Sequence, residues 1–218
     1  EDNGRQVIFS GADFKATFDK QSGLLVSYQY KKQEFIHNGQ GPRPFFWRAP
    51  TDNDYGAKLP VRLKAWKEAS YQEPKAENYN VERDKDTTAV KVTYRFPQTD
   101  ARWDITYKVY GNGVIKVDNH FVAENAQTPM IPRVGLRMQL PARITSLTYY
   151  GRGPEENYRD RRTSQFIGEY TSGIKDMYEP YVRPQENNHR TDIYWCTLTD
   201  KAQEGLLFVA DRTFEMNV

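Results

Sequence analysis

The sequence predicts an all-β fold of antiparallel strands. Three observations support this prediction: short segments of alternating apolar and polar residues recur along the chain, turn residues separate them, and helical periodicity is nearly absent. Tyrosine supplies 15 of the 218 residues, while only 38% of the chain is hydrophobic. Because tyrosine can bury its ring and keep its hydroxyl in water, this composition is typical of sheets with one wet face.

The clearest local prediction is a β-hairpin formed by residues 103–110 and 114–122. Gly111, Asn112 and Gly113 join the two segments, and these residue types tolerate the positive φ of a tight turn. Only residues 61–71 show a loose helical pattern, so we expect a nearly helix-free chain. The remaining predicted strands are residues 7–9, 14–18, 24–30, 90–96, 134–140, 147–150, 193–198 and 206–210.

Two long stretches, residues 38–57 and 151–191, do not follow the strand pattern. Both are rich in proline, glycine, asparagine, charged and aromatic residues. Long irregular segments in a compact domain are usually functional or interfacial, so we expect the functional residues there. No repeat or low-complexity linker divides the chain, which predicts one domain over residues 1–218.

The charge and apolar patterns exclude two classes of partner. The 31 basic and 29 acidic residues give a net charge of +2, and no basic stripe is present. Nucleic-acid binding is therefore not expected, because it needs clustered cations to release counterions. No segment approaches the roughly 20 apolar residues of a membrane span, so no membrane partner is expected. The single cysteine, Cys196, excludes an internal disulfide, and its strand-like surroundings predict a buried, inert thiol.

The first polar segment, residues 45–54, has a composition suited to binding sugars. Aromatic rings stack on the apolar face of a sugar, and Asp, Asn and Arg side chains bond its hydroxyls. The same residues could form an Asx-rich turn beside a core aromatic, and residue types alone favour that structural interpretation. A calcium loop is not indicated, because the glycine and the terminal glutamate of that motif are absent.

Two further polar segments, residues 151–160 and 181–190, lie in the second irregular stretch. Glu155 and Glu156 suggest a glycosidase carboxylate pair, but adjacent side chains usually point apart, so a surface loop is favoured. The histidines lack metal-ligand spacing, and a structural hydrogen-bonding role is favoured for His189.

Residues 46–54, 150–161 and 176–187, taken together in this order, resemble the small-chain domain of large family-two β-galactosidases. The resemblance implies an antiparallel β-supersandwich similar to the galactose-mutarotase superfamily. It also implies a bacterial parent enzyme, cytoplasmic or periplasmic, that hydrolyses terminal β-D-galactosides with retention. The catalytic glutamates of such an enzyme are expected in its barrel domain, so no catalytic residue is expected here. This domain is expected to shape the active-site mouth and the assembly.

The resemblance also implies cofactors and partners. Mg and Na are expected in the parent enzyme and none in this fragment. The expected partners are the barrel and other domains of the same β-galactosidase, the galactoside substrate and further copies in a homo-oligomer. The family domain normally continues past Val218, so we expect a piece truncated at its C-terminus, with an exposed edge near Phe208 and Val209 and a tendency to self-associate. The candidate substrate-binding residues are Trp47, Arg48, Asp52, Asn53, Asp54, Glu155, Asn157 and Arg190.

Two other functions are compatible with these residues. One is a stand-alone carbohydrate-binding β-sandwich module. The other is an epimerase of the mutarotase type, which needs a histidine base and a carboxylic acid facing a sugar hydroxyl. His120 and His189 have no obvious acidic partner in the sequence, so the epimerase is the least favoured.

Overall fold

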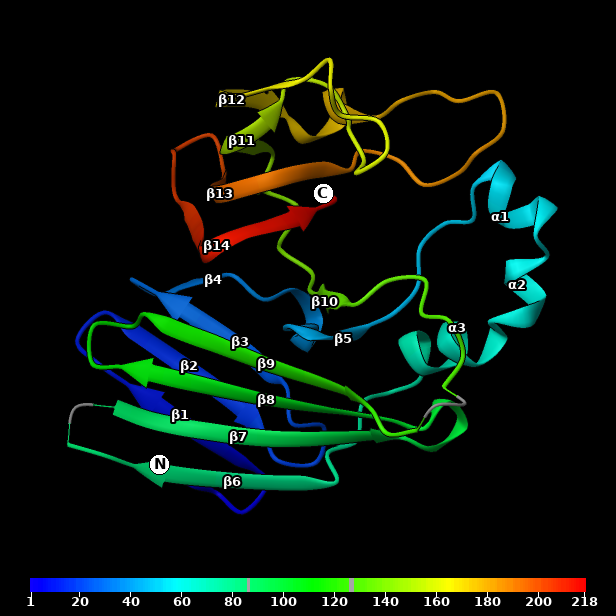
Figure 1. Ribbon diagram of the computed structural model, residues 1–218. Coiled ribbons are helices and arrows are strands. Elements are labelled where there is room, and N and C mark those ends of the chain that lie inside the picture. Colours follow the sequence, from blue (N-terminus) through cyan, green and yellow to red (C-terminus); the bar gives the residue numbers. More distant parts are fainter. Residues whose placement is uncertain (86, 126–127) are drawn as a thin grey trace. The chain divides into compact units, whose positions relative to one another are not determined.

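The computed structural model of the chain describes two compact units, which are formed by different segments (Figure 1). The described residues are 1–85, 87–125 and 128–218. Unit 1 consists of Glu1–Arg48 and Leu59–Pro141. Unit 2 consists of Ala49–Lys58 and Ala142–Val218.

Unit 1 contains two four-stranded antiparallel sheets. The first has the order β1-β2-β3-β4, in which each strand pairs with the next along the chain. The second has the order β6-β7-β8-β9 and is likewise a meander. The strands of the two sheets are β1 (Gln6–Ser10), β2 (Phe14–Asp19), β3 (Leu25–Tyr30), β4 (Gln33–Glu34), β6 (Asn78–Arg83), β7 (Thr87–Phe96), β8 (Ala101–Tyr110) and β9 (Ile115–Ala123).

The predicted hairpin is confirmed by β8 and β9. Burial alternates strictly along β8, as a strand with one face in a core requires. At the turn, Gly113 has a φ of 90°, and the Asn112 side-chain oxygen accepts a hydrogen bond from the Val114 N–H at 3.1 Å. Glycine adopts this left-handed conformation without the steric cost that a side chain would add.

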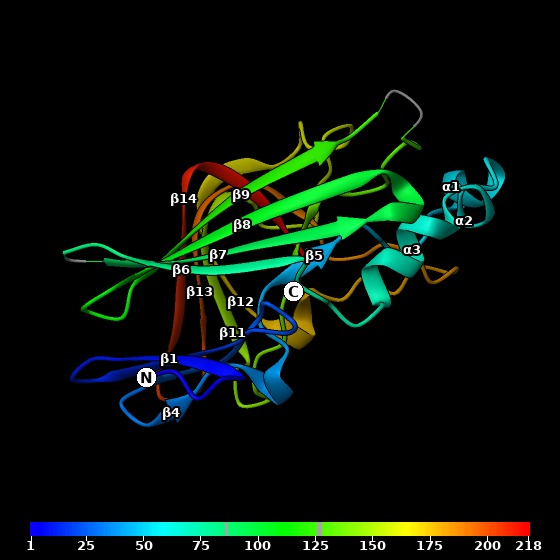
Figure 2. The ribbon, with the colours of Figure 1, turned by 90° about the horizontal axis from the view of Figure 1, so that it is seen from below.

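The core of unit 1 lies between its two sheets, which Figure 2 shows as two layers. Phe18 on β2 and Tyr107 on β8 meet edge to face with ring centroids 5.2 Å apart. The Tyr107 hydroxyl also donates to the Pro42 carbonyl at 3.2 Å, so this buried tyrosine is satisfied. Unit 1 is therefore a β-sandwich stabilised mainly by buried aromatic and β-branched side chains.

Two helices and a small two-stranded sheet complete unit 1. Trp66 is fully buried and packs on Phe46, with ring centroids 4.8 Å apart. The predicted helical segment is confirmed by α3, whereas α2 was not predicted. These elements are β5 (Arg43–Phe45), β10 (Gly135–Arg137), α2 (Leu59–Arg62), α3 (Lys64–Tyr71) and the 3-10 turns at His37–Gly39 and Pro97–Thr99.

Unit 2 contains a four-stranded antiparallel sheet with the order β12-β11-β13-β14. One face packs on the 3-10 turn at Ile174–Met177 and buries a small apolar core. A short helix, α1, comes from the separate Ala49–Lys58 segment. The elements are α1 (Asp52–Gly56), β11 (Ser146–Gly153), β12 (Phe166–Gly173), β13 (Arg190–Thr199) and β14 (Gly205–Met216), and the core residues are Leu147, Tyr149, Met177, Ile193 and Cys196.

The predicted all-β, antiparallel fold class is confirmed. All ten predicted strands correspond to observed strands, although the segment at residues 134–140 shortens to β10. The prediction that residues 151–191 are irregular was wrong in part, because they contain the eight-residue strand β12. The stretch at residues 38–57 likewise contains β5 and α1. The interpretation of residues 1–218 as one small-chain domain stays a prediction.

Candidate functional site

Unit 2 contains a group of polar side chains that are buried beside its small apolar core. We call this group the polar cluster. Its members come from the loop after β11 and from the segment that enters β13. They are Glu156, Asn157, Glu186, Asn188, His189, Arg190 and Thr191. Burying polar groups is costly unless they are hydrogen-bonded, so their bonds define the site.

Asn157 joins the two segments of the polar cluster. Its side chain is fully buried, and its amide nitrogen donates to the carbonyls of Arg152 and Glu155, both at 3.0 Å. Its amide oxygen accepts from the backbone N–H of Thr191 at 3.1 Å and from the Thr191 hydroxyl at 2.6 Å. Both donors and both acceptor positions of the amide are therefore occupied within the chain.

The Glu156 carboxylate fastens both ends of the 181–188 loop. Its side chain is only 6% exposed, although it belongs to an irregular segment. The Tyr181 hydroxyl and the Arg161 guanidinium both donate to Oε1, and the Asn188 backbone N–H donates to Oε2 at 2.9 Å. Burial and the hydrogen bond to Glu156 raise the pKa of Tyr181. The loop is therefore held at both ends by one charged group.

His189 stacks on Tyr158 and bonds through both ring nitrogens. The two rings lie 4.9 Å apart at an interplanar angle of 21°. Nδ1 of His189 lies 3.0 Å from Oδ1 of Asn217, and Nε2 lies 3.2 Å from the Glu215 carboxylate. This confirms the predicted hydrogen-bonding role of His189. The Tyr158 hydroxyl is buried without a hydrogen-bond partner among the described residues, and burial raises the pKa of Tyr158.

The 181–188 loop contacts the α1 segment. Arg183 donates from Nη1 to the Asp52 carboxylate at 2.9 Å, and its guanidinium lies 5.1 Å from the centroid of the Tyr55 ring. Glu186 accepts from the Ala49 N–H at 3.2 Å. These contacts place carboxylate, guanidinium and aromatic groups together on an exposed surface. Such groups can bond sugar hydroxyls and stack on a sugar ring.

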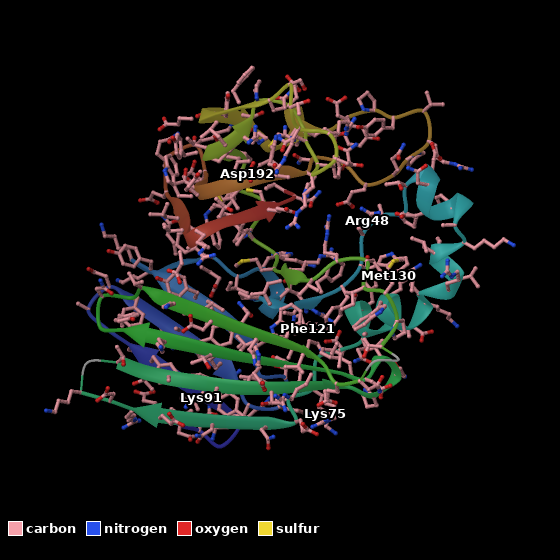
Figure 3. The ribbon with its side chains drawn as sticks, in the orientation of Figure 1. Arg48, Lys75, Lys91, Phe121, Met130 and Asp192 are labelled. Atoms are coloured by element: carbon pink, nitrogen blue, oxygen red, sulfur yellow. The ribbon has the colours of Figure 1, made fainter. Side chains whose placement is uncertain are left out.

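Asp192, a residue of β13 that is labelled in Figure 3, binds two arginines. Arg152 donates to its carboxylate at 2.7 Å and Arg162 at 3.0 Å. Asp192 has a φ of 55°, a left-handed conformation that Asp adopts more readily than most residues. The two arginines are therefore occupied as structural ion pairs within unit 2.

The structure divides the eight candidate substrate-binding residues between the two units. Trp47 and Arg48 belong to unit 1, where Trp47 is part of the buried core. The other six belong to unit 2. Of these, Asp52, Asn53 and Glu155 are exposed, whereas Asp54, Asn157 and Arg190 are buried.

The buried candidates have partners inside the chain. Asp54 completes a capping box at the start of α1, accepting from the Thr51 N–H at 3.0 Å, so its role is structural, but it starts a short helix where an Asx-rich turn was predicted. Arg190 donates to the Tyr149 hydroxyl at 3.3 Å and to the His189 carbonyl at 3.2 Å. Substrate contact by any of the eight residues stays a prediction.

The residues that organise this site were not among the predicted site residues. Glu156, Tyr181 and Arg183 lie within the polar segments quoted above, but residue type alone gives no reason to prefer Glu156 to Glu155. The sequence feature that pointed to this region was the density of aromatic and charged residues in segments without strand periodicity.

Within residues 1–85, 87–125 and 128–218, no group of three or more His, Cys, Asp and Glu side chains could hold a metal ion. Over the same described ranges, none of the helices combines the length and apolar character that crossing a membrane requires.

The antiparallel sandwich of unit 1 and the four-stranded antiparallel sheet of unit 2 define this chain as a protein of the all-β class. The family model described as beta galactosidase small chain matches residues 10–218. The chain therefore belongs to the β-galactosidase small-chain family.

Curated relatives support the same membership. A protein named beta-galactosidase from Priestia megaterium is 35% identical over 217 residues, covering 100% of this chain and 21% of that protein. Beta-galactosidases from Lactobacillus delbrueckii subsp. bulgaricus and Streptococcus thermophilus are both 33% identical, covering 96% and 97% of this chain and 20% of each protein. The chain thus spans about a fifth of the length of these relatives.

Proposed function

We propose that this chain is a non-catalytic domain of a retaining β-galactosidase. The observation that carries the proposal is the family match over residues 10–218, in a chain that spans about a fifth of its β-galactosidase relatives. A retaining glycosidase needs an acid/base and a nucleophile about 5–5.5 Å apart across the scissile bond. In this proposal the remaining four-fifths of the enzyme supplies that pair, together with its Mg and Na.

The role of this domain in the enzyme is to present polar groups at the active-site mouth. The exposed residues of the α1 segment and the 181–188 loop, above all Asp52, Asn53 and Arg183, support this role because their side chains can bond sugar hydroxyls. The buried polar cluster supports it indirectly, since Glu156 fastens the loop that contacts α1. Binding groups act best when their supporting residues are fixed.

A chimeric enzyme tests the proposal. The matching region of the Priestia megaterium β-galactosidase is replaced by this chain, and hydrolysis of a chromogenic β-galactoside is measured for the chimera and for the 218-residue chain alone. We expect turnover by the chimera only, with the β-anomer of galactose released first. Turnover by the chain alone, or a folded chimera without activity, would contradict the proposal.

Two variants of the chimera test the role of the domain. Asp52→Ala should raise KM by about ten- to a hundredfold, because a hydrogen bond to a charged group contributes about 1.5–3 kcal/mol. Asp118→Ala is the matched control, since Asp118 is also an ion-paired carboxylate but lies on β9 of unit 1. Equal KM values for the two variants would show that Asp52 does not contact substrate.

A second candidate function is a carbohydrate-binding module. The rings of Tyr150 and Tyr194 are exposed on the sheet of unit 2, with centroids 5.4 Å apart and planes tilted by 44°. Neighbouring exposed aromatic rings can stack on sugar units. Binding of galactose or lactose to the isolated chain, lost in Tyr194→Ala, would favour this function.

A further inference from the structure

Unit 1 contains a cavity of about 570 Å³ that the proposed function does not use. It lies between the end of α3 and the start of β6, and its lining includes Lys75, which is labelled in Figure 3. Its apolar lining includes Pro44, Tyr94 and Phe96, and the two aromatic side chains are buried in the core. The volume is in the range of sites that take small molecules rather than single ions.

Arg43 gives this cavity a partly buried positive charge. Its guanidinium donates to the Gln40 side chain at 3.3 Å and to the carbonyls of Ser70, at 3.4 Å, and Gln72. All these partners are neutral, and they occupy three of the N–H groups. A guanidinium has five, so Nε–H and one Nη1–H have no partner among the described residues.

The surroundings of Arg43 leave its charge under-compensated. Burial lowers its pKa, and the positive charge of Arg137 acts in the same direction, while Glu73 acts against both. Within the described residues, no carboxylate lies close enough to Arg43 for an ion pair. Partly buried cations are normally paired, because desolvating an isolated charge is costly.

The other cations of the cavity differ in how they are paired. Arg95 is bound by Glu77 at 2.9 Å and by Glu124 at 2.7 Å, so its charge is already neutralised. Lys75 is exposed and has no ion-pair partner among the described residues. Arg43 and Lys75 therefore add positive charge to the cavity lining, which also contains the exposed carboxylates of Glu73 and Glu77.

From this arrangement we propose that the cavity is a binding site for a small-molecule oxyanion, a phosphate or a carboxylate carried on a compact body. The unused Nε–H and Nη1–H of Arg43 lie on different sides of the guanidinium, so each can donate one separate hydrogen bond to such a group, and Lys75 adds a mobile ammonium. The apolar lining covers the body that carries the anion. Capping of the α3 carbonyls explains part of the position of Arg43, but it does not explain the unused donors or the unpaired lysine.

The site can be tested by NMR titration of the ¹⁵N-labelled 218-residue chain, with chloride holding the ionic strength constant. The probes are inorganic phosphate and D-glucuronate, and the neutral comparator is D-galactose. We expect both anions to shift the Arg43 Nε–H signal and the amides of residues 72–77, and galactose to leave them unchanged. Tighter binding of phosphate would identify a phosphate site, and tighter binding of glucuronate a carboxylate site.

Matched variants separate the cavity from general surface charge. Lys75→Met should weaken anion binding about two- to fivefold, as expected for an exposed ion pair. Lys67→Met is the control, because Lys67 is an exposed lysine of α3 outside the cavity lining. Arg43→Lys should weaken binding further while keeping the charge. Absence of anion-dependent shifts, equal losses in the two lysine variants, or equal binding of galactose would overturn the proposal.

Discussion

Replacing Asn157 by alanine should destabilise unit 2 severely. The side chain is fully buried and makes four hydrogen bonds, one to the Arg152 carbonyl on β11, one to the Glu155 carbonyl on its own loop and two to Thr191. The substitution leaves the carbonyls of Arg152 and Glu155 and both groups of Thr191 without these partners. Each is a polar group that must otherwise find water inside the protein.

The size of the effect follows from these four bonds. At about 0.5–1.5 kcal/mol net for each bond, their loss lowers the free energy of unfolding by roughly 2–6 kcal/mol. A small domain has only about 5–15 kcal/mol of stability, so such a loss would unfold much of unit 2 at moderate urea concentrations. Unit 1 has its own core, so its strands should be affected less.

Hydrogen exchange read by mass spectrometry across a urea series measures this for each unit. In Asn157→Ala, peptides from β11 and β13 should lose protection at lower urea than in the wild type, while peptides from β7 and β8 keep theirs. Asn53→Ala is the control, because Asn53 is an exposed asparagine of unit 2, and it should change stability by less than about 0.5 kcal/mol. If both variants lose protection at the same urea concentration, the proposed role of the Asn157 bonds is wrong.

Three further predictions concern single features of unit 2. Burial raises the pKa of the Cys196 thiol to about 12, so between about pH 9 and pH 12 the folded chain keeps a proton that the unfolded chain has lost. The free energy of unfolding that this thiol contributes is therefore fully present below about pH 9 and falls as the pH rises above that value. A thiol reagent at pH 8 should react with Cys196 only after unfolding. Arg183→Ala removes an exposed ion pair with Asp52 and should lower the free energy of unfolding by less than about 1 kcal/mol. The backbone amides of α1 should nevertheless exchange their hydrogens faster. Unchanged exchange would show that Arg183 does not hold this segment. Leu207 and Val209 are 62% and 69% exposed on the edge strand β14, so the chain should self-associate in a sedimentation concentration series. The double variant Leu207→Thr and Val209→Thr should remain monomeric at concentrations where the wild type does not.

The strands that the sequence analysis missed lie at the edges of their sheets. The missed strands are β4, β5, β6 and β12, and each pairs with only one neighbour. β4, β6 and β12 contain no buried residue, and β5 is only three residues long. Period-two alternation is clearest when one face of a strand is buried, so it extends over all ten residues of β8, whereas in β6 it covers only the first five residues. The helix α1 had a readable signal in the Thr51 and Asp54 capping box, but a five-residue helix has too few turns to show apolar periodicity.

From the sequence, the candidate site could be located only to two segments, residues 38–57 and 151–191. Composition identified residues 151–191 as unusual, because few strands combine so many charged, aromatic and turn residues. Which side chain lies inside and which lies outside depends on the backbone path through the loop. Glu155 is exposed, whereas the side chain of Glu156 is only 6% exposed, although the two are neighbours of the same type. Sequence patterns outside regular strands and helices cannot make that distinction.

The polar cluster explains how unit 2 keeps long irregular segments in one conformation with a small apolar core. Apolar burial is non-directional and would allow the 181–188 loop several positions. A carboxylate that accepts bonds from Tyr181, Arg161 and the Asn188 N–H allows far fewer, because each donor must satisfy a geometry as well as a distance. The loop that contacts Asp52 and Tyr55 is thus fixed by directional bonds. A surface that is to recognise sugar hydroxyls needs this kind of support, since a hydrogen bond to a displaced group loses most of its strength.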